Sequence, residues 1–301
     1  MFHLIAAANH LFSIFYMLFK VAEPAELMTF LRQKLPQKSR NNIKTLLHDQ
    51  QVWVDNAPVT QFNYLLKPQQ QVEIKREKTA TVQPPRGLPI LFEDSHLIVI
   101  NKPAGLLSMA TDREKQQTAY GQLSNYVKQQ NPQNKIFIVH RLDRDTSGIM
   151  VFAKSENAKN LLQEFWNTDT KERIYVALTE GCPKASAGTI TSYLHESKAL
   201  IVYSSQNPQH GQKAITHYET LKTNQHHALL RVRLQTGRKN QVRVHLQDLG
   251  SPIIGDKKYG ATTNPIGRLG LHALVLGFLH PITNEALRFE TPIPTSFLTL
   301  F

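Results

Sequence analysis

The chain of 301 residues is 41% hydrophobic and 19% charged, which is ordinary for a globular protein with a substantial buried core. Its 35 Lys and Arg outweigh its 23 Asp and Glu, and the net charge of +12 favours a nucleic-acid partner, although a basic protein without such a role stays open. The one cysteine, Cys182, excludes an internal disulfide and fits a reducing cytoplasm.

The first twenty residues are rich in apolar side chains. His3, Asn9, His10 and Ser13 interrupt them, so no apolar span of membrane length exists. The apolar residues also lack the basic stretch that precedes them in a secretion signal. We therefore predict that residues 1–23 form an extra N-terminal helix or a translated leader, and we keep membrane anchoring as a less favoured alternative.

A first folded unit is expected over residues 24–78. The spacing of apolar residues predicts an amphipathic helix over Ala25–Leu35, and Ser39 is suited to cap the start of a second helix. The pair Asp55-Asn56 predicts a hairpin turn, and the segment VEIKR predicts a closing strand. Together these elements predict a small α/β module.

This first unit is basic, and a linker is predicted after it. Residues 27–78 contain nine Lys or Arg and four Asp or Glu, a net charge of +5. The charge is densest around the second predicted helix, where Arg40 and Lys44 face outward. Residues 79–87 are polar and contain two adjacent prolines, which is typical of a linker between domains.

Residues 88–301 are dominated by predicted strands. Apolar runs typical of strands lie at residues 97–103, 136–140, 148–154, 173–181, 214–221 and 228–235. Two helices interrupt them, one over Ser155–Trp166 with Ser155 as its N-cap and one over Arg238–Leu249 with Gly250 after it. Many strands and few helices predict an α+β domain with a mixed, largely antiparallel sheet.

A loop between two of these strands carries a high density of reactive side chains. Residues 140–148 (HRLDRDTSG) include two Arg, two Asp, a Thr and a Ser. Loops held between rigid strands are common places for catalytic groups. In the simpler alternative, Asp143 and Asp145 cap backbone amides and the arginines are solvated. We favour a catalytic role, because a plain turn does not need this many charged residues.

Five segments resemble the motifs of the RluA class of pseudouridine synthases, and they occur in the order of that class. They are NKPAGLLS at 101–108, HRLDRDTSGIMVFAK at 140–154, RIYVAL at 173–178, TGRKNQVRVHLQDLGSPIIGDKKYG at 236–260 and RLGLHALVLGFLHP at 268–281. Residues 27–77 resemble the small S-four-like (alpha-L) RNA-binding module that often precedes this catalytic domain. The resemblance implies an RNA-binding module over residues 24–78 and a pseudouridine synthase catalytic domain over residues 88–301.

The resemblance also implies roles for individual residues. Asp143 would be the nucleophile, Tyr175 would lie against the target uracil and assist proton transfer, and Arg243 would pair with Asp143. Arg141 would help to hold the RNA once the uridine has left its stack. The chemistry asks for these residue types, because a guanidinium keeps a carboxylate ionised and an aromatic ring offers a stacking surface for a flipped base.

Further RNA contacts are expected from Arg40, Lys44 and Arg238. One motif departs from the class. It commonly reads Gly-Arg-Thr-His-Gln, whereas residues 237–241 here read Gly-Arg-Lys-Asn-Gln. This departure puts a contact by Asn240 in doubt but leaves the predicted role of the nearby arginine untouched.

No metal, other cofactor, membrane or obligate protein partner is expected. The isomerisation needs no metal or redox carrier, His226-His227 lacks the spaced partners of a metal site, and Lys102 is expected to shape its loop. The resemblance implies a cytoplasmic enzyme that acts on large-subunit ribosomal RNA or, second, on transfer RNA, with the target uridines left open. Two other classes remain as alternatives: a non-catalytic RNA-binding protein on the same fold, and a glycosidase or RNA N-glycosylase, which would release free uracil.

Overall fold

The computed structural model describes residues 17–75, 83–110, 114, 117–164, 166 and 172–301. The chain separates into two compact units, Met1–Val82 and Gln83–Phe301. This division falls within residues 79–87, the segment that is expected to be a linker. None of the helices in the described residues is long and apolar enough to span a membrane.

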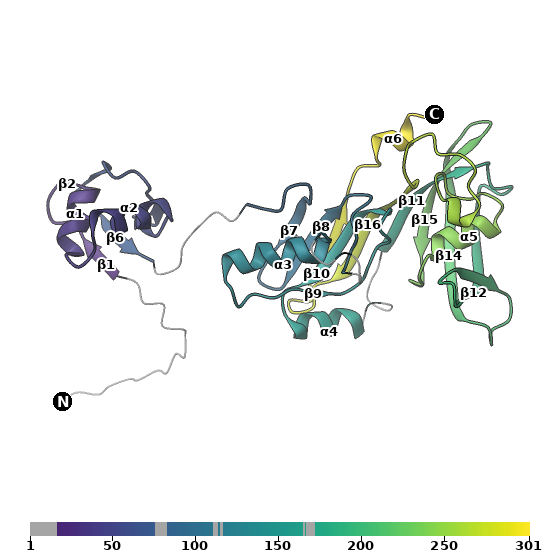
Figure 1. Cartoon of the computed structure of the whole chain (residues 1–301), viewed down its shortest axis with the longest axis horizontal. Coiled ribbons are helices and arrows are strands. Elements are labelled where there is room, and N and C mark those ends of the chain that lie inside the picture. Colours follow the sequence, from purple (N-terminus) through teal and green to yellow (C-terminus); the bar gives the residue numbers. More distant parts are fainter. Residues whose placement is uncertain (1–16, 76–82, 111–113, 115–116, 165, 167–171) are drawn as a thin grey trace. The chain divides into compact units, whose positions relative to one another are not determined.

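The small unit combines two helices with a four-stranded sheet (Figure 1). The sheet has the strand order β1-β6-β3-β4, and β2 and β5 pair separately. The elements are β1 (Met17–Lys20), β2 (Ala25–Glu26), α1 (Leu27–Lys34), α2 (Arg40–His48), β3 (Val52–Val54), β4 (Ala57–Pro58), β5 (Leu65–Leu66) and β6 (Gln71–Ile74). Apolar side chains from both helices and from the sheet form one core, which includes Leu27, Leu31, Ile43, Leu47 and Val72.

Strand β1 corrects the prediction of an extra helix or leader over residues 1–23. Residues 1–16 of that segment lie outside the described residues, but Met17–Lys20 pair antiparallel with the whole of β6. Phe19 packs on the core of the unit, with its ring edge-on to that of Phe30 at 6.4 Å. Local spacing of apolar residues cannot show this arrangement, because strand pairing depends on a partner that is distant in the sequence.

The local signals for the two helices and the hairpin of the small unit are confirmed. Ser39 caps α2, because its Oγ accepts a hydrogen bond of 3.2 Å from the backbone N–H of Asn42. Asp55 and Asn56 have φ values of 48° and 66°, as a two-residue turn between β3 and β4 requires. These features are set by neighbouring residues, so the sequence alone suffices to predict them.

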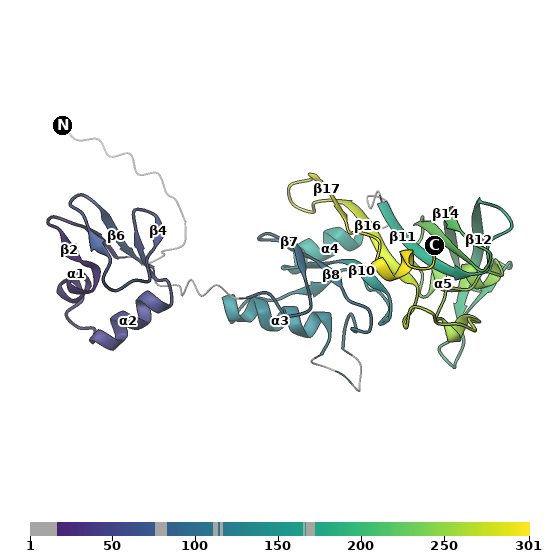
Figure 2. The ribbon, with the colours of Figure 1, turned by 90° about the horizontal axis from the view of Figure 1, so that it is seen from above.

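The large unit is built on an 11-stranded sheet flanked by helices (Figures 1 and 2). The sheet path runs β13-β12-β14-β15-β11-β16-β10-β8-β7, with β17 beside β16 and β9 beside β10. The strands are β7 (Ile90–Glu93), β8 (Leu97–Lys102), β9 (Phe137–Ile138), β10 (Ser147–Ala153), β11 (Glu172–Glu180), β12 (Ala187–Glu196), β13 (Val202–Ser205), β14 (Gln212–Thr223), β15 (His227–Leu234), β16 (Leu271–Leu279) and β17 (Ala286–Glu290). Among the described strands, β10 and β16 pair in parallel and the other pairings are antiparallel. The predicted α+β class with a mixed, largely antiparallel sheet is confirmed.

Helices cover both halves of this sheet. They are α3 (Ala119–Gln130), α4 (Glu156–Glu164), α5 (Gln241–Asp248), the 3-10 helix η1 (Lys257–Tyr259) and α6 (Thr295–Leu298). α4 packs Ala158 and Leu162 on β8, β10 and β16, and Figure 2 shows α3 on the opposite side of these strands. α5 packs Val242 and Leu246 on the half formed by β11, β14 and β15.

Two predictions for the helices of the large unit are wrong in detail. The 12-residue helix α3 is absent from the predicted elements, although Thr118 carries its start signal by accepting a 3.0 Å hydrogen bond from the N–H of Gly121. α5 begins at Gln241 rather than at Arg238, because Asn240 has a left-handed φ of 54° that a right-handed helix does not contain.

The close approach of β10 and β16 depends on Gly148. Its φ is +117°, and a Cβ there would lie 2.2 Å from the carbonyl oxygen of Ala273. We expect Gly148→Ala to lower the free energy of unfolding by about 3 kcal/mol, because overpacking and backbone strain add. Gly87→Ala has a positive φ but open space around it, so it should cost only about 1 kcal/mol. Equal free energies of unfolding for the two variants, measured by urea unfolding, would contradict the proposed close packing at Gly148.

Candidate active site

The loop that carries Asp143 is fixed by hydrogen bonds on both sides of this residue. Ser108 Oγ donates to the carbonyl oxygen of Leu142 at 2.6 Å and accepts from the N–H of Leu142 at 3.2 Å. The N–H of Gly105 donates to the carbonyl oxygen of Arg144 at 2.9 Å. Both partners come from the loop after β8, so this loop positions the segment in front of β10.

Lys102, at the end of β8, ties the same two loops together. Its side chain is fully buried, and Nζ donates to the carbonyl oxygens of Pro103, Leu106 and Arg144 at 3.0, 2.7 and 2.9 Å. Burial lowers the pKa of this amine to about 8, so it is charged at neutral pH and all three of its hydrogens are used. The prediction that Lys102 shapes its loop is confirmed by these contacts.

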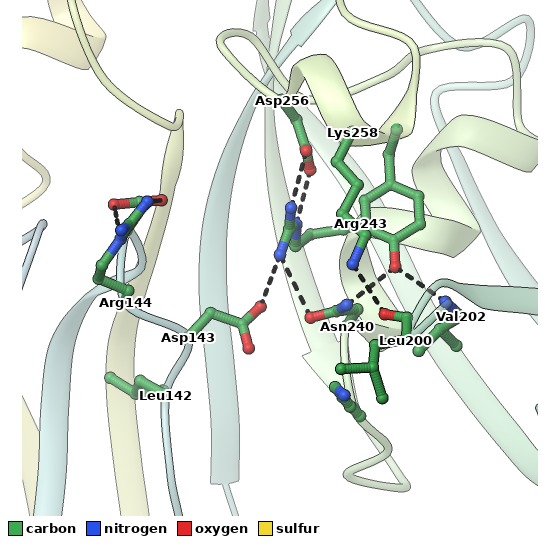
Figure 3. Close-up of polar contacts among 12 residues, drawn as sticks. Leu142, Asp143, Arg144, Leu200, Val202, Asn240, Arg243, Asp256 and Lys258 are labelled. Carbon is green, nitrogen blue, oxygen red and sulfur yellow. Dashed lines mark hydrogen bonds and ion pairs between the residues drawn. The ribbon is translucent and has the colours of Figure 1, made fainter. Parts of the chain in front are cut away.

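Arg243, on α5, brings two carboxylates together (Figure 3). Its Nε and Nη2 donate to the two oxygens of Asp256 at 2.7 and 2.8 Å, and its Nη1 donates to Oδ2 of Asp143 at 3.1 Å. The predicted contact between Arg243 and Asp143 is therefore present. Because the pair with Asp256 is bidentate, it fixes the plane of the guanidinium and so the direction in which Nη1 points.

The two carboxylates differ in accessibility. The side chain of Asp256 is 1% exposed, whereas that of Asp143 is 28% exposed. Within the described residues, no hydrogen bond occupies Oδ1 of Asp143. Burial alone would lower the pKa of Arg243, but the hydrogen bonds and charges of Asp256 and then of Asp143 raise it, so the arginine stays charged. Asp143 thus has a charged partner at Oδ2, and among the described residues its Oδ1 accepts no hydrogen bond.

Tyr175 lies on β11 and lines the same cavity as Asp143. Burial raises the pKa of its phenol to about 12, with the charge of Arg173 acting against this shift and the charge of Asp143 adding to it. The hydroxyl therefore keeps its proton at neutral pH. Its half-buried ring can stack against a base, and its hydroxyl can pass on a proton.

A cavity of about 270 Å³ joins these groups with the start of α5. Its lining includes five of the predicted site residues: Asp143, Tyr175, Arg243, Arg141 and Arg238. Arg141 and Arg238 are both exposed. Arg238 lies in the loop before α5, not on the helix, and its Nε donates to the carbonyl oxygen of Lys213 at 3.1 Å. The cavity therefore combines the carboxylate of Asp143 with two accessible cations.

The two other predicted RNA contacts lie in the small unit. Arg40 and Lys44 are both on α2, and both side chains are exposed. Neither forms an ion pair with another described residue. Their charges are therefore available to a polyanion.

Comparison with known proteins decides the family. A family model described as RNA pseudouridylate synthase matches residues 96–248, about half of the chain, including Asp143 and Arg243. The chain belongs to the RNA pseudouridylate synthase family. The uncharacterized RNA pseudouridine synthase YhcT of Bacillus subtilis is 33% identical over 267 residues, which cover 87% of this chain and 88% of that protein. The ribosomal large subunit pseudouridine synthase D of Nitrosomonas europaea is 33% identical over 291 residues, which cover 90% and 81% of the two chains.

A solved structure supports the same family. Human RNA pseudouridylate synthase domain containing 4 has a TM-score of 0.59 and 28% identity, over 70% of this chain and 90% of that one. The resemblance to the RluA class is confirmed by these similarities, and the chain is an RNA pseudouridine synthase, an isomerase that converts uridines of RNA into pseudouridine. The family assignment favours isomerisation over the glycosidase and the non-catalytic alternatives.

Two residues of the synthase site could not be assigned from the sequence. Asp256 belongs to the same motif as Arg243, but only the turn before η1 brings its carboxylate to the guanidinium. Asn240 stands where the family motif commonly has histidine, and its Oδ1 accepts a 3.2 Å hydrogen bond from Nη1 of Arg243. The contact with Asp256 depends on the path of the chain between α5 and η1, and the contact with Asn240 depends on the left-handed backbone of this residue at the start of α5.

Proposed function

We propose that Asp143 is the nucleophile of this synthase, that Arg243 keeps it ionised and oriented, and that Tyr175 lies against the target uracil. The observation that carries this proposal is the 3.1 Å hydrogen bond from Arg243 to a partly exposed Asp143. A guanidinium beside a carboxylate favours the charged form, and the charged form is the one that can act as a nucleophile.

The proposed reaction moves one glycosidic bond and conserves every atom. The bond between ribose C1′ and uracil N1 breaks, the base turns while it stays in the site, and a bond forms between C1′ and C5. C5 loses a proton and N1 gains one. Asp143 takes part by adding to the sugar or to the base, or by stabilising the transient sugar cation. The neutral phenol of Tyr175 offers the detached base a stacking surface and a group that can pass on a proton.

The two exposed arginines of the cavity, Arg141 and Arg238, hold the RNA in this proposal. A uridine inside a helix must leave its stack before C5 can be reached. The phosphates on either side of the flipped nucleotide then need counter-charges, which exposed guanidinium groups supply. Their position on the lining of the cavity supports this role.

Large-subunit ribosomal RNA is the proposed substrate, and transfer RNA is the second candidate. The similar protein from Nitrosomonas europaea is named for the large ribosomal subunit, and a net charge of +12 suits a large structured RNA. The exposed free thiol of Cys182 fits a reducing compartment, which supports action in the cytoplasm.

Base-resolution mapping of pseudouridine tests the substrate. RNA from a strain that lacks this gene should lose specific pseudouridines of large-subunit ribosomal RNA, and the wild-type chain should restore them while Asp143→Asn should not. Losses confined to transfer RNA would favour the second candidate. Release of free uracil by the purified enzyme would contradict isomerisation, because an isomerase keeps the base.

The small unit is proposed to bind RNA through α2. We expect the full-length double variant Arg40→Ala/Lys44→Ala to bind structured RNA more weakly, with a slope of log affinity against log salt that is shallower by about one to two units. A matched control, Lys20→Ala/Lys67→Ala, removes two exposed charges elsewhere in the same unit. Equal effects of the two double variants in a salt titration of RNA binding would mean that α2 has no special role.

A further inference from the structure

One nitrogen of Arg243 serves two acceptors. Nη1 donates to Oδ2 of Asp143 at 3.1 Å and to Oδ1 of Asn240 at 3.2 Å (Figure 3). The other two nitrogens are held by Asp256. An Nη nitrogen carries two hydrogens, so both contacts of Nη1 can exist at once. Asn240 therefore takes one hydrogen of Nη1 and leaves the other directed at Asp143.

Asn240 is itself held in place. It is 9% exposed, and its left-handed φ of 54° is a conformation that asparagine adopts more readily than most residues. Its Nδ2 donates to the hydroxyl of Tyr259 at 2.8 Å. Arginine is only a donor, so the amide oxygen must face Arg243 and the amide nitrogen must face Tyr259. The hydrogen bonds at both ends thus define one orientation of the side chain.

Tyr259 connects this pair to an edge strand of the sheet. It is 1% exposed, and its hydroxyl also accepts a hydrogen bond of 3.3 Å from the N–H of Val202, the first residue of β13. The guanidinium carbon of Arg243 lies 4.8 Å from the centre of its ring. One buried phenol therefore supports Arg243 through its ring and Asn240 through its hydroxyl.

We propose that Asn240 is a positioning residue for the isomerisation, which holds Nη1 of Arg243 against Asp143 with Tyr259 as its anchor. The proposal rests on the roles proposed above for Asp143 and Arg243. A neutral amide binds the guanidinium without competing with Asp143 for its positive charge. When Asp143 moves to react and its contact with Nη1 lengthens, Asn240 keeps the guanidinium in place.

The family motif commonly has histidine at the position of Asn240, so the motif does not predict the contact between Asn240 and Arg243. Histidine tolerates a left-handed φ, but its ring places donor and acceptor nitrogens differently from the amide of Asn240. The amide instead spans Arg243 and Tyr259 with one acceptor and one donor. The asparagine and the tyrosine hydroxyl therefore form one functional unit in this chain.

Asn240→Gly and Tyr259→Phe test the proposal. Glycine accepts the φ of 54° and removes only the side chain, and phenylalanine keeps the ring under Arg243 but removes the hydroxyl. We expect single-turnover rates at saturating RNA to fall on the order of tenfold in Asn240→Gly and by a smaller factor in Tyr259→Phe, with unchanged RNA affinity. Tyr126→Phe is the control. Tyr126 lies on α3, and the variant removes its hydroxyl, which is bonded to Glu93 at 2.8 Å, so the wild-type rate should be kept.

Asn240→Asp distinguishes the positioning role of Asn240 from a purely structural role. The new carboxylate would be a third negative charge around Arg243, beside those of Asp143 and Asp256. Unlike the amide, this carboxylate would compete with Asp143 for the charge and the hydrogen bonds of Nη1. The rate of this variant at saturating RNA should therefore fall below that of Asn240→Gly, although aspartate keeps the size of asparagine.

The results of these experiments distinguish the positioning role of Asn240 from the roles proposed for Asp143 and Arg243. Wild-type rates at saturating RNA in Asn240→Gly and Tyr259→Phe would overturn it, as would a loss confined to RNA affinity. If thermal unfolding shows that Asn240→Gly does not fold, wild-type rates in both Tyr259→Phe and Asn240→Asp overturn it equally. Asp143→Asn belongs in the same assay. If Asp143→Asn is active, the proposed nucleophile is rejected. If Asp143→Asn is inactive but the Asn240 variants react at the wild-type rate, only the positioning role is rejected.

Discussion

Replacing Asp143 by asparagine should lower the rate constant of pseudouridine formation by about 10³-fold or more. The amide has nearly the shape of the carboxylate, and its oxygen can still accept the hydrogen bond from Nη1 of Arg243, so the geometry of the site should survive. The amide is nevertheless not a competent nucleophile. RNA affinity should change little, because most of it comes from contacts with phosphates. Single-turnover conversion and RNA binding measured on one preparation check both statements.

Asp145→Asn is the matched control for this prediction. It makes the same chemical change two residues further along the loop, where the carboxylate is half-exposed and pairs with Arg144 at 3.2 Å. We expect it to keep the wild-type rate, because its carboxylate is not part of the Arg243 pair. Robust turnover by Asp143→Asn would reject the nucleophile, and equal losses in the two variants would point to damage to the loop as a whole.

The parts of the fold that depend on neighbouring residues could be predicted from the sequence. Ser39 caps α2 and Asp55-Asn56 form the turn after β3, because a cap and a two-residue turn need only local side chains and local φ values. The strands around the Asp143 loop also follow from their apolar runs. α3 is missed although Thr118 caps it, because its polar sequence gives a weak apolar stripe.

The parts that depend on distant residues could not be predicted. β1 is a strand because it pairs with β6, and no property of its own residues shows that partner. The same limit applies to the candidate site. The family motifs led to Asp143 and Arg243, but the bidentate pair with Asp256 arises from the path of the chain after α5, and the hydrogen bond from Arg243 to Asn240 arises from the left-handed backbone before this helix. Motifs thus led to the contact between Asp143 and Arg243, and only the structure supplies the groups that orient the guanidinium.

Arg243→Met should fold and bind RNA but react on the order of 10²-fold more slowly, since it loses the charged hydrogen bond that orients Asp143. Methionine keeps much of the length and the apolar contacts of the arginine stem. The loss also leaves the nearly buried Asp256 without its partner, so the variant should be less stable as well. Arg288→Met, which breaks an exposed pair with Glu172 outside the site, is the control and should keep the wild-type rate.

Arg243→Lys distinguishes charge from geometry. An ammonium restores a positive charge but cannot reproduce the fork that binds Asp256 through two nitrogens while Nη1 reaches Asp143. We expect this variant to recover only part of the rate lost in Arg243→Met. In the rival view, Arg243 contacts an RNA phosphate. The methionine variant would then lose affinity, its salt slope would fall by about one unit, and its rate at saturating RNA would hold. Single-turnover rates at saturating RNA, measured beside RNA affinity, decide between the two, because a normal maximal rate in Arg243→Met would reject the ion pair as the basis of catalysis.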